Sequence, residues 1–453
     1  MMKAFVIAIV LLCCILMFFV KRKYKIGILI SGTILFTIVN VPLLPFHGAN
    51  QLLPLAFILS ELKQIKNQIR SSRHTIVWKL CGLSIFMMLL TIIFSPHLSD
   101  FSSIRYFIQA ELFFKYFAIL YAFCGYSSME SIKPTLRMTF VAMIVITFLG
   151  LVNYLTKSAD YVSTMLAGVE NTGIGASGDE AGQVFMDRER FRVQAMFLNP
   201  FDYGYICVLV LLLHIYGYIN KLENKWSFIL VLACCVFGIV SCGCRTNIFC
   251  ALFGVSIFSL FAYKLGKSIR LALIILLVAI AAYQFVPSVQ EVVDNMMTMF
   301  DKNSDVSGSS MELRTLQYGA ILYHIQNNPF FGCGYNYFLI DMGWGLGKEY
   351  LKDQRLAGLE GVAMNYILER GLVGFFLYLT YYITVIVFFL KNRRYAMHTV
   401  ALGLSVVGTY LSFANMTGEL LSVYPTLLLL GYVFKVIYCN KLDSTVAVGN
   451  KGL

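Results

Sequence analysis

Long, uninterrupted apolar segments recur along this 453-residue sequence, and they constrain its fold more than any other feature. The first covers residues 4–20, all of them apolar, and the basic tripeptide Lys21-Arg22-Lys23 closes it without a small-x-small cleavage site. It therefore predicts a membrane span and not a cleaved signal peptide. Hydrophobic residues make up 58% of the chain and charged residues 13%, proportions unlike those of soluble domains. The sequence predicts an all-α, polytopic integral membrane protein.

We expect about 12–13 transmembrane helices in a single membrane domain over residues 1–453. The count is twelve if the short third segment is a re-entrant piece. The predicted spans are residues 4–20, 26–44, 51–61, 77–95, 106–124, 137–156, 200–219, 226–241, 246–263, 270–286, 361–390, 397–414 and 420–438.

The net charge of +12 is distributed unevenly about these spans. Basic residues gather on every second connection, whereas the short connections on the other side hold only Arg105 and Arg245. Because Lys and Arg stay on the cytoplasmic side, we expect the N-terminus outside and the C-terminus inside. Both long loops, residues 157–199 and 287–360, are then extracytoplasmic. The net positive charge is thus explained by the arrangement of the spans in the membrane, and we expect no nucleic-acid partner.

The second long loop carries the pattern of short helices. Residues 289–300 repeat apolar side chains at helical spacing and predict an amphipathic helix on the membrane surface. Ser309 and Glu312 form a capping box that starts a second helix, which Asn328-Pro329 ends. One face of that helix carries Arg314, Gln317, Ile321 and His324.

Charged residues in or beside the spans are functional candidates, because burying one in a bilayer costs about 2.5–3.5 kcal/mol. Arg245 starts a span and has no acidic residue near it in sequence. Either it helps to bind an anion at that helix N-terminus, or its side chain snorkels to the membrane surface. Arg192 follows a cluster of alternating charges and faces either a ligand or solvent. Glu111 and Lys115 are spaced to pair on one helix face, and so are structural candidates.

Cysteine and histidine positions do not predict a metal site. Cys242 and Cys244 lack the second pair or histidine that zinc needs, and most other cysteines lie in apolar segments.

Four stretches resemble, in the same order, motifs of the bacterial O-antigen polymerase and O-antigen ligase superfamily. They are residues 192–201 (RVQAMFLNPF, with Arg192, Asn199 and Pro200), residues 241–245 (SCGCR), Arg314 followed by residues 328–334 (NPFFGCG), and residues 365–374 (NYILERGLVG, with Asn365, Glu369 and Arg370). Ala195 stands where the pattern has glycine, and Met364 stands where the ligases have a histidine.

The resemblance implies glycosyl transfer at the outer face of the bacterial cytoplasmic membrane, with a glycan carried on undecaprenyl diphosphate and with no metal or other cofactor. It implies that Arg245 and Arg314 hold the diphosphate and that Arg192 assists. Asn199, His324 and Asn365 are further candidates for substrate contact. Glu360, with Glu369 next, is the candidate general base, since a carboxylate can accept the acceptor's proton.

Together these features predict a polysaccharide polymerase that transfers the growing chain onto the next lipid-linked repeat unit. Its expected partners are the lipid-linked glycan, membrane lipid and, as a candidate, a protein that regulates chain length. One alternative is an O-antigen ligase, with the same donor and a lipid A-core acceptor; the absent histidine at Met364 counts against it. The other is a transporter or flippase of lipid-linked sugars, which needs charged residues along a path through the membrane.

Overall fold

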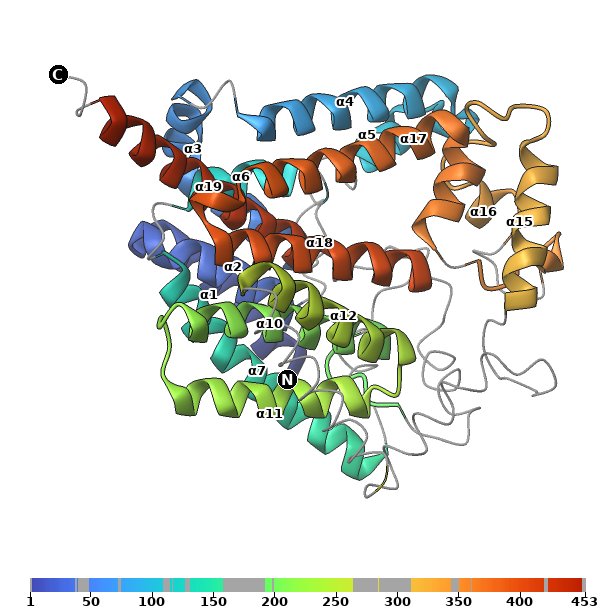
Figure 1. Ribbon diagram of the computed structural model, residues 1–453. Helices are drawn as coiled ribbons and strands as arrows, with labels where there is room; N and C mark the ends of the chain where they lie inside the picture. The colour runs from blue at the N-terminus through green and yellow to red at the C-terminus, as the bar shows by residue number, and fades with distance from the viewer. Residues whose placement is uncertain are drawn as a thin grey trace.

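The computed structural model describes residues 2–36, 39, 49–71, 75–108, 115, 117–126, 131–157, 192–197, 199–263, 284, 311–343, 350–359, 361–418 and 423–449. The regular elements in this part of the chain are helices, which confirms the all-α prediction (Figure 1). The α-helices are α1 (Met2–Phe19), α2 (Arg22–Leu35), α3 (Ala49–Ser71), α4 (Ile76–Phe94), α5 (Phe101–Ile108), α6 (Phe117–Gly125), α7 (Ile132–Thr156), α10 (Pro200–Ile219), α11 (Lys225–Ser241), α12 (Arg245–Ala262), α15 (Met311–Ile325), α16 (Tyr337–Ile340), α17 (Val362–Lys391), α18 (Met397–Thr417) and α19 (Val423–Gly449). Short 3-10 helices are η1 (Pro96–Leu98), η7 (Gln354–Leu356) and η8 (Arg393–Tyr395).

Six of the described helices are long and apolar enough to cross a membrane: α4, α7, α10, α12, α17 and α18. Two shorter apolar stretches, Ala4–Phe19 and Lys225–Ser241, lie in α1 and α11. The chain is therefore a multi-pass membrane protein. Several sequence-based predictions lie outside the described residues: the span over residues 270–286 apart from Gln284, the amphipathic helix over 289–300, the residues Glu111, Ser309 and Glu360, and most of the loop 157–199.

α10 lies at the centre of the bundle, with 83% of its span buried inside the protein. It contacts α7, α11, α12 and α18, while α4 runs beside α17 on another side of the bundle (Figure 1). α12 and α18 pack along each other in antiparallel directions: Cys250 Sγ lies 3.7 Å from the Thr409 carbonyl oxygen, and Arg393 Nη2 donates to the Phe261 carbonyl at 2.9 Å. The start of α12 and the end of α18 consequently meet at one end of the bundle.

The sequence sets the start of α10. Asn199 is its N-cap, because the Asn199 Oδ1 accepts a hydrogen bond from the Asp202 N–H at 2.8 Å. Pro200 follows at the first helical position, where no backbone donor is needed. Asn224 caps α11 in the same way, accepting from the Ser227 N–H at 2.7 Å. Both starts agree with the predicted spans.

Gly371 divides α17 into two halves with a non-helical conformation, φ 62° and ψ −166°. The break leaves the carbonyls of Leu368 and Glu369 without helical partners. Cys333 N–H donates to the Leu368 carbonyl at 2.8 Å, and Gly334 N–H donates to the Glu369 carbonyl at 2.9 Å. The turn before α16 therefore completes the end of the first half.

The same turn also completes the start of the second half. The N–H groups of Leu372 and Val373 donate to the carbonyls of Pro329 and Phe330 at 3.0 and 3.1 Å. Gly332 lies so close that a Cβ there would come 2.7 Å from the Leu368 carbonyl oxygen. Backbone hydrogen bonds thus hold the turn at residues 329–334 against the break at Gly371, about 40 residues later in the sequence.

α15, α16, η7 and the first half of α17 form a small unit at one end of the bundle, which we call the cap (Figure 1). The cap has its own apolar core, formed by Ala320, Ile321, Ile325, Phe338, Met342, Leu351, Leu356, Leu359, Met364 and Leu368. α15 confirms the predicted second helix, which ends before Asn328-Pro329. Met364 is buried in this core and has a packing role.

Candidate functional site

Arg192 and Arg245 come together where α12 begins, and we call them the arginine pair. Val193 N–H donates to the Ser241 carbonyl at 3.1 Å, which fixes the segment before α10 against the end of α11. The stem of Arg192 lies along Gly243, where a Cβ would come 3.3 Å from the Arg192 Cγ. The two guanidinium groups are close enough to repel each other electrostatically. Both side chains are partly exposed.

Within the described residues, no carboxylate forms an ion pair with either member of the arginine pair. The N–H groups at the start of α12, an 18-residue helix that begins at Arg245, add their partial positive charge at the same place. Two guanidinium groups that repel each other beside a helix N-terminus favour a bound anion, because the anion offsets that repulsion.

Two polar side chains with buried atoms flank Arg245 in sequence. Asn247 Oδ1 is buried and has no hydrogen-bond partner within the described part of the chain, whereas the buried Ser241 Oγ lies beside the Tyr203 hydroxyl. Asn247 Nδ2 donates to the Phe201 carbonyl at 3.0 Å, so the amide is held in place while its oxygen stays unsatisfied. Unsatisfied buried polar atoms are costly and mark places where a ligand or water belongs. Sequence reasoning did not single out either residue, although both flank Arg245.

Ala195 has φ +48°, the left-handed region that favours glycine. An alanine side chain fits this conformation less well than glycine does. The strain costs on the order of 1 kcal/mol.

Arg314 lies at the same end of the bundle. Its Nη2 donates to the Met416 carbonyl at 3.2 Å, in the last turn of α18, which is the end of α18 that lies beside the start of α12. Its Nη1 lies 3.4 Å from the Gln317 Oε1. Gln317 is fully buried and donates to the Ala357 carbonyl at 3.0 Å, an anchoring role that the sequence did not indicate. Arg314 thus joins the cap to α18.

Asn365 lies in the first turn of α17, beside that junction. Its Oδ1 is buried and has no hydrogen-bond partner among the residues described. Asn415 Oδ1 caps the helix by accepting from the Ala363 N–H at 3.1 Å, and Gly361 packs against the Asn415 backbone.

Asn199, another candidate for substrate contact, lies at the start of α10. Both polar atoms of its side-chain amide form hydrogen bonds with Asp202. Its observed role is to cap α10.

His324 is held inside the cap and not beside the arginine pair. Its Nε2 lies 3.0 Å from Asp353 Oδ2 and its Nδ1 lies 3.2 Å from the Tyr337 hydroxyl. Arg355 forms a two-point hydrogen-bonded ion pair with Asp353. Arg355 above all, with His324, lowers the pKa of Asp353 from 3.8 to about 2. The observed contacts give His324 a structural role in the cap.

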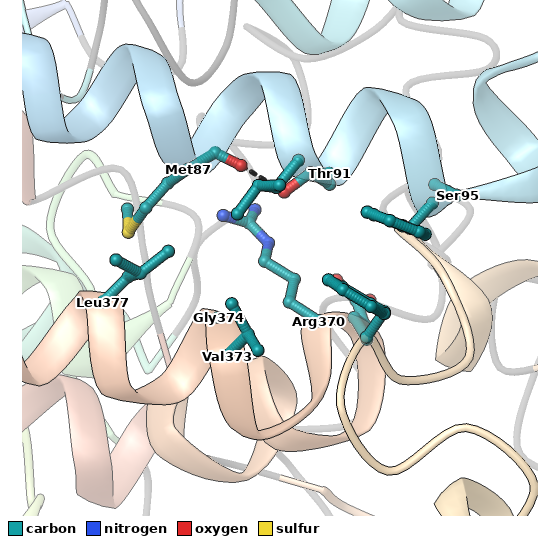
Figure 2. Close-up of a pocket in the computed structure, with 11 residues that line it drawn as sticks. Met87, Thr91, Ser95, Arg370, Val373, Gly374 and Leu377 are labelled. Carbon is teal, nitrogen blue, oxygen red and sulfur yellow. Dashed lines mark hydrogen bonds between the residues drawn. The ribbon is translucent and has the colours of Figure 1, made fainter.

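Glu369 and Arg370 line a pocket between α4 and α17 (Figure 2). The guanidinium of Arg370 points toward α4 and lies beside Thr91. Arg370 is 8% exposed, and it lies over the Tyr366 ring at 4.4 Å. Lys115 Nζ donates to the Tyr366 hydroxyl at 2.9 Å from the other direction. Two buried cations therefore share one tyrosine, a cluster that the sequence pairing Glu111–Lys115 did not indicate.

The arginine pair, Arg314 and Asn365 are thus placed at one end of the bundle. His324 and Glu369 belong to the cap at the same end, but His324 contacts Asp353 within the cap and Glu369 lines the pocket beside α4. Neither the models of known protein families nor the curated protein sequences match this chain.

Proposed function

We propose that this protein is a polysaccharide polymerase of the bacterial cytoplasmic membrane, acting at its outer face on glycans linked to undecaprenyl diphosphate. The observation that carries the proposal is the arginine pair at the N-terminus of α12, without an ion-paired carboxylate in the described part of the chain. Two guanidinium groups can bind two adjacent phosphates with paired, directional hydrogen bonds.

The proposed reaction transfers the growing chain to the next repeat unit. A hydroxyl of the acceptor sugar attacks the anomeric carbon of the donor, the bond from that carbon to the diphosphate oxygen breaks, and undecaprenyl diphosphate leaves. Charge develops on the diphosphate, where Arg192 and Arg245 stabilise it electrostatically. Arg314 binds the same diphosphate from the cap.

The proton of the acceptor hydroxyl passes to a carboxylate in this scheme. Glu360 is the first candidate base, since it directly precedes Gly361 at the junction of α17 and α18, and its own placement lies outside the described residues. Glu369 is the second candidate; it lies in the pocket beside Arg370, two residues before the break at Gly371 in α17.

A polymerase is favoured over an O-antigen ligase by Met364. This side chain is 5% exposed and packs in the cap core, at the position where the resembled ligases have a histidine. A residue with that packing offers no proton acceptor to a lipid A-core hydroxyl. Deleting the gene separates the two enzymes: loss of a polymerase leaves core capped by single units, and loss of a ligase leaves uncapped core.

A carrier of lipid-linked sugars is the second candidate function. It is favoured by the buried cluster of Lys115, Tyr366 and Arg370, because cations inside a membrane bundle often line the path of an anion. A carrier moves lipid-linked units between leaflets of a liposome and joins no sugars.

The deciding experiment is elongation by the purified full chain in detergent, with lipid-linked repeat units as the only substrate. A polymerase yields a ladder of products from the wild type. Arg192→Gln and Arg245→Gln each reduce the rate by about 10²–10³-fold, the usual loss when one charge-stabilising donor is removed. Arg393→Gln, at the other end of α12, keeps the wild-type rate. No ladder from the folded wild-type protein contradicts the proposal.

A further inference from the structure

A second site lies at the opposite end of α11 from the arginine pair. It is a wide groove between the start of α7, the start of α11 and the loop that joins α10 to α11. α11 has 17 residues, so the groove and the arginine pair are about 25 Å apart along this helix and lie near opposite faces of the membrane. We call this feature the basic groove. It takes no part in the proposed reaction.

Three cations lie at the outer rim of the basic groove. Lys133 and Arg137 are one helical turn apart on α7, and Lys221 lies in the α10–α11 loop. All three side chains are exposed. Lys221 has φ +57°, a left-handed turn conformation that a lysine rarely adopts.

The deeper walls of the groove are apolar. Val141 follows Arg137 by one turn on α7 and is 57% exposed, and Leu230 follows Trp226 by one turn on α11. Trp226 is 78% exposed at the end of its helix, the level at which tryptophan side chains usually meet lipid head groups. Cations at the helix ends with apolar side chains toward the membrane centre match a phospholipid, whose phosphate lies above its acyl chains.

Glu223, the one carboxylate among the described residues that line the groove, is turned inward. Its Oε2 lies 2.7 Å from His214 Nδ1, inside the bundle. Its Oε1 is buried as well. The negative charge of Glu223 is therefore directed away from the three cations, and the rim keeps a net positive charge. The phosphate of an anionic phospholipid complements that charge, and the apolar walls complement its acyl chains.

We infer that the basic groove binds an anionic phospholipid. The phosphate contacts Lys133, Arg137 and Lys221, and an acyl chain lies along Val141 and Leu230. A choline head group fits less well, since it carries a cation toward the lysines.

The test is a lipid titration of the purified full chain by native mass spectrometry. Phosphatidylglycerol is compared with phosphatidylcholine of the same acyl chains, and the wild type is expected to bind phosphatidylglycerol more tightly. In the triple variant K133Q/R137Q/K221Q this preference falls by about fivefold for each cation removed. The charge-preserving variant K133R/R137K/K221R keeps it, which separates loss of charge from loss of fold.

The matched control is K63Q/K66Q, two exposed lysines of α3 that do not line the groove. It keeps the preference of the wild type. The inference is overturned if the triple variant retains phosphatidylglycerol as well as this control does, or if the wild type binds both lipids equally. It is also overturned if inorganic phosphate alone displaces the lipid from the wild type and Trp226→Ala has no effect, because the site then binds a soluble anion and not a lipid.

Discussion

Asp353 links His324 and Arg355 at the surface of the cap, with an Oδ2–Nη2 distance of 2.8 Å to Arg355. Arg355 and His324 act on this carboxyl in the folded state only, and Arg355 accounts for the largest part of its lowered pKa. The cap is therefore more stable when Asp353 is ionised.

This coupling predicts a pH dependence of stability. A carboxyl whose pKa falls on folding, here from 3.8 to about 2, stabilises the protein fully above the higher value and loses that contribution as the pH drops to the lower one. We expect Asp353→Asn to lower the thermal unfolding temperature at pH 7, with a difference from the wild type that shrinks between pH 4 and about 2. Thermal unfolding in detergent measures it. A difference that stays constant over this range contradicts the assignment.

Single residues were predicted unevenly from sequence. Arg192 and Arg245 were recognised because an arginine without an acidic neighbour is unusual beside a span, and the structure brings them together. The N-cap role of Asn199 was not assigned, even though Asn-Pro is a common helix start. The sharing of Tyr366 by Lys115 and Arg370 could not be foreseen, because it joins residues 251 positions apart and sequence spacing reports only neighbours on one helix.

α17 is the element on which the cap and the bundle depend. Its break at Gly371 and the turn at residues 329–334 satisfy each other's backbone hydrogen-bonding groups. Gly332 and Gly371 have positive φ, and a Cβ at either position would overlap backbone atoms, so both positions require glycine. Sequence alone predicted the span, since an apolar run is a local signal. It could not predict that the turn would dock onto the span, because no local pattern encodes that contact.

Two glycines with the same φ test this contact. Gly371 and Gly358 both have φ +62°, but a Cβ at Gly371 would overlap the Phe330 carbonyl, whereas no atom of the described residues lies within 4 Å of a Cβ at Gly358. Gly358→Ala is expected to cost about 1 kcal/mol for the left-handed conformation alone. Gly371→Ala is expected to cost about 3 kcal/mol or more, because Gly371 has ψ −166°, a conformation open essentially to glycine alone, and because the Cβ must also displace backbone.

The measurement is the free energy of unfolding of each variant relative to the wild type. Equal costs for Gly371→Ala and Gly358→Ala mean that the turn does not restrain α17.

The whole molecule is a helical bundle with a cap at one end and a basic groove at the opposite end of α11. The membrane class followed from the apolar segments alone, because a bilayer admits few other structures for them. Six described helices have the length and hydropathy of spans, and the total of 12–13 remains a prediction.

Orientation is the prediction that belongs to this scale. The distribution of Lys and Arg predicts an external N-terminus, an internal C-terminus and an external cap. A fluorescent reporter that folds only in the cytoplasm should be active after Leu453, and a phosphatase that folds only outside should be active when inserted after Gly343 in the cap. The opposite pattern places the arginine pair on the cytoplasmic side and removes the proposed substrate from its reach.

The most direct measurement of the central claim is the affinity of the purified full chain for undecaprenyl diphosphate, the leaving group of the proposed reaction. Charge-assisted hydrogen bonds contribute about 1.5–3 kcal/mol, so Arg245→Gln should weaken binding by about 10- to 100-fold. Arg393→Gln, on the far end of the α12–α18 pair, should bind as the wild type does. If Arg245→Gln binds undecaprenyl diphosphate as tightly as the wild type, the arginine pair is not a diphosphate site and the proposed enzyme has no donor pocket there.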